Sequence, residues 1–155
     1  MKLKNSQLLV IRQLDKKLKS YSDLIKTPSP TLGWINVLRT TLNMSLRQLG
    51  KRLNMSAQGV KDLEKREADG SITLKSLREA GESLHMKLVY SFIPIEGSLE
   101  KMIEDKSRKM AIKIVTRTSM TMSLEDQSNS EKRLKQAIEE LTQEIKKEMP
   151  KTLWD

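Results

Sequence analysis

SLRQLGKRLNMSAQGVKDLEKRE, residues 45–67, is the stretch that decides the fold of this chain. Its apolar residues recur three or four positions apart, which is the spacing of one face of an α-helix. Ser45 and Ser56 each stand just before such a pattern and are typical helix N-caps. Asn54 and Met55 separate the two patterns, so the stretch predicts two short helices joined by a tight turn.

A helix-turn-helix places particular demands on such a stretch, because its two helices cross close to the turn. Gly50 is the small residue that the crossing needs, and Leu49 and Leu53 face inward on the same helix. Val60 and Leu63 return the second helix to the core. The stretch therefore predicts a helix-turn-helix whose second helix turns a different, polar face outward.

The outward face of the second helix consists of small or polar residues: Ala57, Gln58, Lys61 and Asp62. We interpret it as a face that reads base edges of double-stranded DNA, where glutamine pairs with adenine and lysine donates to guanine. Asp62 either accepts from cytosine or repels phosphate, and Gly59 either lets the helix approach the sugar-phosphate backbone or is neutral. The residues expected to contact phosphate flank this face: Ser45, Arg47, Ser56, Lys65 and Arg66.

The first half of the chain divides at the linker TPSP, because its prolines cannot continue a helix. Residues 1–30 predict a basic amphipathic helix followed by this linker. Arg12, Lys16 and Lys19 on that helix either add phosphate contacts or belong to a helix that only covers the core. Residues 31–85 hold four short helical patterns and form the expected DNA-binding domain.

Residues 86–94, MKLVYSFIP, predict a single short strand, since β-branched and aromatic residues end there at a proline. A lone strand needs a partner for its backbone groups, and the sequence contains no second strong strand. The simplest partner is the same strand of a second copy, paired antiparallel in a homodimer. TRTSMTM, at 116–122, is a weaker candidate within the chain.

Residues 95–155 predict a C-terminal helical region, opened by Ser98 and interrupted by the polar QSNS at 127–130. The helix after this break carries a heptad-like apolar stripe: Leu134, Ile138, Leu141 and Ile145. The stripe either packs on the chain's own helices or enters a coiled coil, for which it is short.

The composition favours a polyanion as partner and argues against catalysis. The net charge is +9, and most of the excess lies in the first 85 residues, which suggests nucleic acid or an anionic membrane surface unless it only aids solubility. The chain has no cysteine and one histidine, His85, and it contains no phosphate-binding glycine loop. We expect a cytoplasmic protein without a membrane span, a metal, a cofactor or a catalytic site.

Residues 33–84 resemble the helix-turn-helix domain of phage repressors, the XRE or Cro/lambda-repressor type. In that family an arginine on the first helix pairs with a glutamate near the end of the recognition helix. Arg39 and Glu64 occupy the matching positions, so the resemblance implies a structural ion pair. Leu46 stands where the family often has a phosphate-clamping glutamine, and the usual glycine after the recognition helix is missing from EKREADGSIT.

A resemblance that covers nearly the whole chain is to the family called mobile mystery protein A. It is carried by RQLDKKL, PTLGWINVLR, SLRQLGKRLNMS, EADGSITLKSLREAGESL, LVYSFIP and TMSLEDQ. The resemblance implies an all-α fold with a lambda-repressor-like core, and a sequence-specific DNA-binding regulator, a repressor, of a mobile-element operon.

The same resemblance offers a second function, because the family is encoded beside a protein with a Fic domain. The alternative is an antitoxin-like protein that binds and restrains a Fic-domain partner. Residues 121–125 match the first five positions of a pattern found in Fic inhibitors, with Glu125 as its glutamate. Asp126 stands where that pattern has glycine or asparagine.

Overall fold

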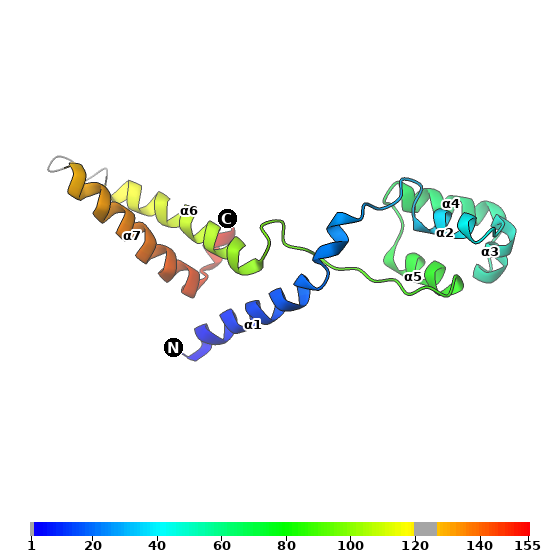
Figure 1. The fold of residues 1–155 in the computed structure, drawn as a ribbon, viewed down its shortest axis with the longest axis horizontal. Coiled ribbons are helices and arrows are strands. Elements are labelled where there is room, and N and C mark those ends of the chain that lie inside the picture. The colour runs from blue at the N-terminus through cyan, green and yellow to red at the C-terminus, as the bar shows by residue number, and fades with distance from the viewer. Residues whose placement is uncertain (1, 120–126) are drawn as a thin grey trace. The chain divides into compact units, whose positions relative to one another are not determined.

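The computed structural model of the chain describes residues 2–119 and 127–155 (Figure 1). Over these residues the fold is helical throughout, which confirms the predicted all-α class. The α-helices are α1 (Lys2–Lys19), α2 (Trp34–Thr41), α3 (Leu46–Leu53), α4 (Ala57–Ala68), α5 (Leu74–Ser83), α6 (Leu99–Ser119) and α7 (Gln127–Glu148). Two 3-10 helices accompany them, η1 (Ser22–Lys26) and η2 (Lys151–Trp154). Among the described helices, none has both the length and the apolar character that a bilayer crossing requires.

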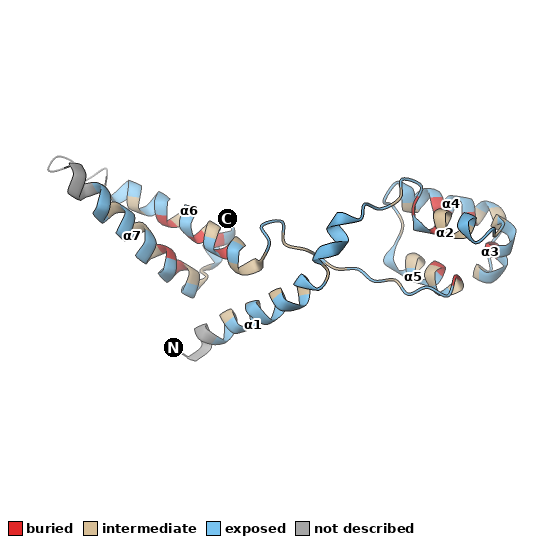
Figure 2. Cartoon of the chain, viewed as in Figure 1, coloured by how far each residue is buried: buried red, intermediate tan, exposed pale blue. Residues whose placement is uncertain are grey.

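The chain forms two compact units, and we call the one at Leu24–Ser91 the central unit. Its four α-helices, α2 to α5, enclose one apolar core (Figure 2). The buried members of this core are Ile35, Leu49, Val60, Leu63, Ala80 and Leu84. Ser45, Ser56 and Thr73 cap α3, α4 and α5, each accepting a hydrogen bond from the backbone N–H three residues on.

The junction between α3 and α4 leaves no space for a side chain at residue 50. Asn54 ends α3 in the left-handed conformation (φ 54°), and the Met55 N–H donates to the Gly50 carbonyl at 2.9 Å. A Cβ atom on Gly50 would lie 2.5 Å from the Met55 carbonyl oxygen, well inside van der Waals contact. A Cβ atom on Gly59 would meet only the side chains of Met55 and Ser56, at 3.4 Å. The local geometry therefore demands glycine at residue 50 and not at residue 59.

Glu67, in the last turns of α4, caps the N-terminus of α2. Its carboxylate accepts from the backbone N–H groups of Trp34 at 2.9 Å and Ile35 at 2.8 Å. Gly33 precedes them at φ 81°, and a Cβ atom there would lie 2.7 Å from the Glu67 carboxylate. A negative charge at a helix N-terminus is favourable because the helix dipole is positive there. The cap therefore joins the first and third helices of the central unit.

The second unit, which we call the terminal unit, combines Met1–Asp23 with Phe92–Asp155. In it α6 and α7 lie side by side (Figure 1), and α1 and η2 also contact α6. The buried core residues are Ile103, Ala111, Ile145 and Leu153. Part of the predicted apolar stripe on the last long helix, Ile138, Leu141 and Ile145, belongs to this core. The stripe thus packs on the chain's own helices.

Polar contacts tie α1 to α6. The Asp15 carboxylate accepts from the backbone N–H groups of Leu99 at 2.7 Å and Glu100 at 3.1 Å, and so caps α6. Arg12 forms an ion pair with the Glu100 carboxylate at 3.0 Å. The hydrogen bond from Arg12 lowers the pKa of Glu100 and raises the pKa of the Arg12 guanidinium. Arg12, considered above for phosphate contact, is thus engaged within the chain.

Lys146 of α7 extends this network to the second long helix. Its Nζ atom lies 2.7 Å from Glu104 and 3.3 Å from Glu100. Burial by itself lowers the pKa of Lys146, but hydrogen bonds and charge attraction from Glu104 and Glu100 outweigh it, and the net pKa is raised. Lys146 therefore remains charged and links α7 to Glu100 and Glu104 of α6.

Two segments differ from the predictions. Residues 86–94 adopt no regular structure, so the predicted strand is not formed within this chain. The reason is that the described residues contain no second strand with which its backbone groups could pair. TRTSMTM does not supply one either, because residues 116–119 form the last turn of α6 and the remainder lies outside the described residues. The predicted break at 127–130 is wrong, since these residues begin α7; QSNS contains neither proline nor glycine, and its polar residues suit a helix start.

Replacing the two helical glycines by alanine should have opposite effects on the central unit. In a Trp154→Phe background, Trp34 is the single tryptophan and its fluorescence follows this unit during urea unfolding. Gly50→Ala should lower the free energy of unfolding by about 2 kcal/mol, because it forces a methyl group onto the Met55 carbonyl. Gly59→Ala should leave it unchanged or raise it by up to about 1 kcal/mol, through helix propensity. Equal stability of the two variants would contradict the close packing at residue 50.

Candidate nucleic-acid interface

The buried side of α4 anchors it in the central unit, and the opposite side is open to solvent. Val60 and Leu63 are buried in the core, whereas Gln58, Lys61 and Asp62 are exposed. Lys65, four residues after Lys61, lies on the same exposed face, which consists of residues 58, 61, 62 and 65. Ala57, predicted as the first base-reading residue, is half-buried. Three of the four predicted base-reading residues, Gln58, Lys61 and Asp62, are therefore gathered on one exposed side of a short helix.

Gln58 and Asp62 interact with each other on this face. The Gln58 side-chain N–H donates to the Asp62 carboxylate at 2.9 Å, across one helical turn. A glutamine amide has two N–H groups and a carbonyl oxygen. Asp62 therefore orients Gln58 and still leaves it one donor and one acceptor, the pair that adenine recognition uses. This orienting role is a third possibility for Asp62, beside the two considered from the sequence.

The start of α3 carries three exposed polar residues, two of which serve the helix itself. The Ser45 hydroxyl accepts from the Gln48 N–H at 3.2 Å, and the Gln48 side chain accepts from the Ser45 N–H at 2.8 Å. This capping box uses the Ser45 oxygen as an acceptor and leaves its hydroxyl hydrogen as a donor. Ser56 is used in the same way at the start of α4. Arg47 is exposed in the first turn of α3.

Lys65 and Arg66 lie in the last turn of α4, and both are exposed. Cations at this end of a helix also interact favourably with its dipole, so these two residues have a local role as well. Asp69 follows them as the C-cap of α4. The Ser71 hydroxyl and backbone N–H donate to the Asp69 carboxylate and lower its pKa, so this acid stays charged beside the two cations.

The Arg39–Glu64 ion pair implied by the repressor resemblance is present. Both side chains are nearly buried, 12% and 8% exposed, and the guanidinium donates from two nitrogens to the two carboxylate oxygens. Arg39 also donates to the Met44 carbonyl at 2.9 Å, and Asn36 donates to Glu64 at 2.7 Å. The pair therefore joins α2, the α2–α3 connection and α4, and so helps to fix the orientation of α4 within the central unit.

Sequence reasoning missed several residues that shape this surface. Glu67 has no local sequence signal, because it caps a helix that begins 33 positions earlier in the chain. Lys51 does have a sequence signal, since it lies four residues after Arg47 and is also exposed on α3. Lys51, Gln48 and Arg52 line a surface hollow of about 420 Å³ next to the α2–α3 connection.

Comparisons with protein-family models, with curated proteins and with solved structures give no match to this chain. Within residues 2–119 and 127–155, no three histidine, aspartate or glutamate side chains are grouped so as to hold a metal ion. The Fic-inhibitor-like pattern at 121–125, with Glu125, lies outside the described residues. What can be inferred about function therefore comes from the surfaces of the two units.

Breaking the Arg39–Glu64 pair from one side should destabilise the central unit strongly. Arg39→Met and Glu64→Leu should each lower the free energy of unfolding by about 3 kcal/mol, because each leaves a nearly buried charge unpaired. The double variant should lose much less than the sum, since no buried charge remains. Urea unfolding followed by Trp34 fluorescence measures the stability of all three variants. Arg78→Met, at an exposed position of α5, is the control. Additive losses would show that the two charges are not coupled.

Proposed function

We propose that this chain is a sequence-specific DNA-binding transcriptional regulator with a helix-turn-helix at α3–α4. The observation that carries the proposal is the exposed polar face of α4, held by buried Val60 and Leu63 next to a turn that tolerates only glycine at residue 50. A short helix presented in this way is what entry into a DNA major groove requires. The resemblance to XRE-type repressors and to mobile mystery protein A agrees with it and suggests a repressor in a mobile-element operon.

In the proposed complex, α4 lies in the major groove and α3 crosses the backbone above it. Gln58, oriented by Asp62, pairs with adenine, and Lys61 donates to guanine. Arg47, Lys65 and Arg66 neutralise phosphates, which supplies affinity without sequence preference. Repression follows from occupancy of the operator, and it becomes autoregulation where the operator overlaps the protein's own promoter.

We further propose that the chain binds DNA as a homodimer through residues 86–94. These residues adopt no regular structure in the single chain, and Val89 and Tyr90 are more than half exposed. Antiparallel pairing with the same segment of a second copy would provide a ladder partner for these backbone groups. A two-fold arrangement would present two α4 helices to half-sites about 34 Å apart.

The wild-type protein should discriminate the DNA upstream of its own gene from a scrambled duplex of equal length. A gel-shift titration at two salt concentrations measures both affinity and salt dependence. Tight binding to the upstream DNA alone would support the proposal. Equal, salt-sensitive binding to both duplexes would mean that the +9 charge acts without specificity, and attention would pass to the alternative, a Fic-domain partner.

Two substitutions should separate base reading from phosphate binding. Lys61→Ala should reduce the preference for the operator by about tenfold or more, because it removes a base contact. Arg47→Ala should weaken binding to all duplexes alike and reduce the salt slope by about one. Lys75→Ala, an exposed cation on α5, is the charge-matched control and should change neither. If Lys61→Ala behaves like the control, the assignment of base contacts is wrong.

Proline in residues 86–94 should dissociate the dimer. Successive N–H groups of a strand point to opposite sides, so either Leu88→Pro or Val89→Pro must remove a donor that faces the partner. Sedimentation equilibrium should report a dimer for the wild type and for Val89→Thr, and a monomer for at least one proline variant, with unchanged helical circular dichroism. A dimer in both proline variants, or a wild-type monomer, contradicts the proposed contact.

A further inference from the structure

Helix α6 of the terminal unit carries two carboxylates on one flank and a row of cations on another. Its acidic flank, Glu100 and Glu104, is engaged by Arg12 and Lys146, as described above. Its basic flank consists of Lys106, Lys109, Lys113 and Arg117, which follow one another at steps of three, four and four residues. This spacing places all four cations along one side of the helix, over about 16 Å of its length.

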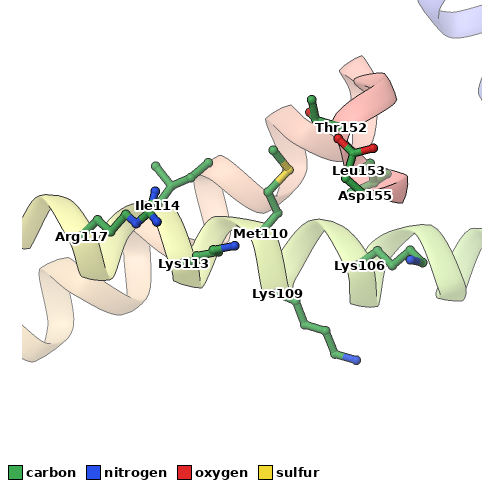
Figure 3. Close-up of a pocket in the computed structure, with 9 residues that line it drawn as sticks. All are labelled: Lys106, Lys109, Met110, Lys113, Ile114, Arg117, Thr152, Leu153 and Asp155. Atoms are coloured by element: carbon green, nitrogen blue, oxygen red, sulfur yellow. The ribbon is translucent and has the colours of Figure 1, made fainter.

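The basic flank borders a groove of about 510 Å³ between α6 and η2, shown in Figure 3. Met110 and Ile114 of α6 contribute its apolar surface, and Ile114, next to Lys113 and one turn before Arg117, is 41% exposed. Leu153 and Thr152 of η2 line the facing side. Asp155 is the one acidic side chain among the lining residues.

The four cations have few partners of their own. Lys106 lies over the Trp154 ring, with Nζ 5.3 Å from the ring centre. In the part of the chain that the structure describes, Lys109, Lys113 and Arg117 form no ion pair. Like charges one helical turn apart repel each other and disfavour the helix. Asp105, four residues before Lys109, offsets part of this repulsion, and an acidic partner would relieve the remainder.

We propose that this groove binds an acidic amphipathic α-helix of a partner protein. Acidic residues at the same steps of three, four and four along such a helix would each face one cation. Apolar residues between them would cover Met110 and Ile114. This site belongs to the terminal unit and goes beyond the proposed DNA-binding function of α4.

The apolar surface of the groove favours a protein helix over a nucleic-acid backbone. A phosphate backbone would neutralise the cations but would leave Met110 and Ile114 without an apolar partner. An amphipathic helix satisfies both features, because it offers carboxylates and apolar side chains on adjacent strips of one surface.

The test uses the full-length chain and a fluorescein-labelled, 18-residue synthetic peptide. The peptide carries glutamates at steps of three, four and four, with leucines beside them, and a scrambled peptide of the same composition is the specificity control. Fluorescence anisotropy should show at least tenfold tighter binding of the patterned peptide. Lys109→Glu with Lys113→Glu should weaken that binding at least tenfold, and Ile114→Ser at least threefold.

The matched control is Lys101→Glu with Lys147→Glu, which makes the same charge change at exposed positions outside the groove. This control should leave peptide affinity within twofold, and circular dichroism establishes that every variant is folded. Equal binding of the two peptides, or equal losses in the two charge variants, would overturn the proposal as a charge effect alone.

A random 20-base-pair duplex provides the nucleic-acid arm. The groove variant should lower affinity for this duplex no more than the control variant does. A loss at least tenfold greater than that of the control would make the groove a nucleic-acid site and overturn the proposal. Lys61→Ala should leave peptide binding unchanged, so failure of the groove proposal and failure of the DNA-binding proposal are distinguishable.

Discussion

The close approach of Gly50 to the Met55 carbonyl oxygen is the constraint on which the central unit depends. It lets the chain leave α3 and enter α4 within three residues, at a distance that a single methyl group would prevent. Val60 and Leu63 can then reach the core that Leu49 begins. The polar face of α4 is exposed as a consequence, because the buried positions of the same helix are already committed.

Carboxylates hold helices in place within each of the two units. Glu64 receives Arg39 and Asn36, Glu67 caps α2, and Asp15 caps α6 in the terminal unit. Each acts between segments distant in the sequence and offsets part of the cost of burying polar groups. With one phenylalanine, two tyrosines and two tryptophans in the whole chain, the cores are small and aliphatic. Hydrogen bonds and ion pairs of this kind therefore contribute strongly to the orientation of the helices.

The basic surfaces of α4 and α6 differ in chemistry, and the difference separates the two proposals. On α4 the cations accompany Gln58 and Asp62, which offer both donors and acceptors, as base edges require. On α6 the cations border the apolar side chains of Met110 and Ile114, and no asparagine or glutamine is among the described residues that line the groove. Net charge alone would treat the two surfaces as equivalent, whereas the side chains between the cations indicate different ligands.

Local chemistry by itself determined the helix starts and the inward residues. Ser45, Ser56 and Thr73 cap their helices through hydrogen bonds that span three residues, and apolar spacing is set by the helical repeat, so both are readable from sequence. The exposed positions of the candidate site on α4 were readable for the same reason. The extent of α7 was not, because QSNS is compatible with either a break or a first turn.

Only the tertiary structure decided the contacts that join distant segments. The Glu67 cap, the Asp15 cap and the hydrogen bond network of Lys146 depend on where the helices pack, and no local pattern encodes that. The strand expected at residues 86–94 failed in the single chain for the same reason, since a strand is stable only with a neighbour. The groove beside α6 likewise exists because η2 folds back on the helix, whereas its cations are evenly spaced in the sequence.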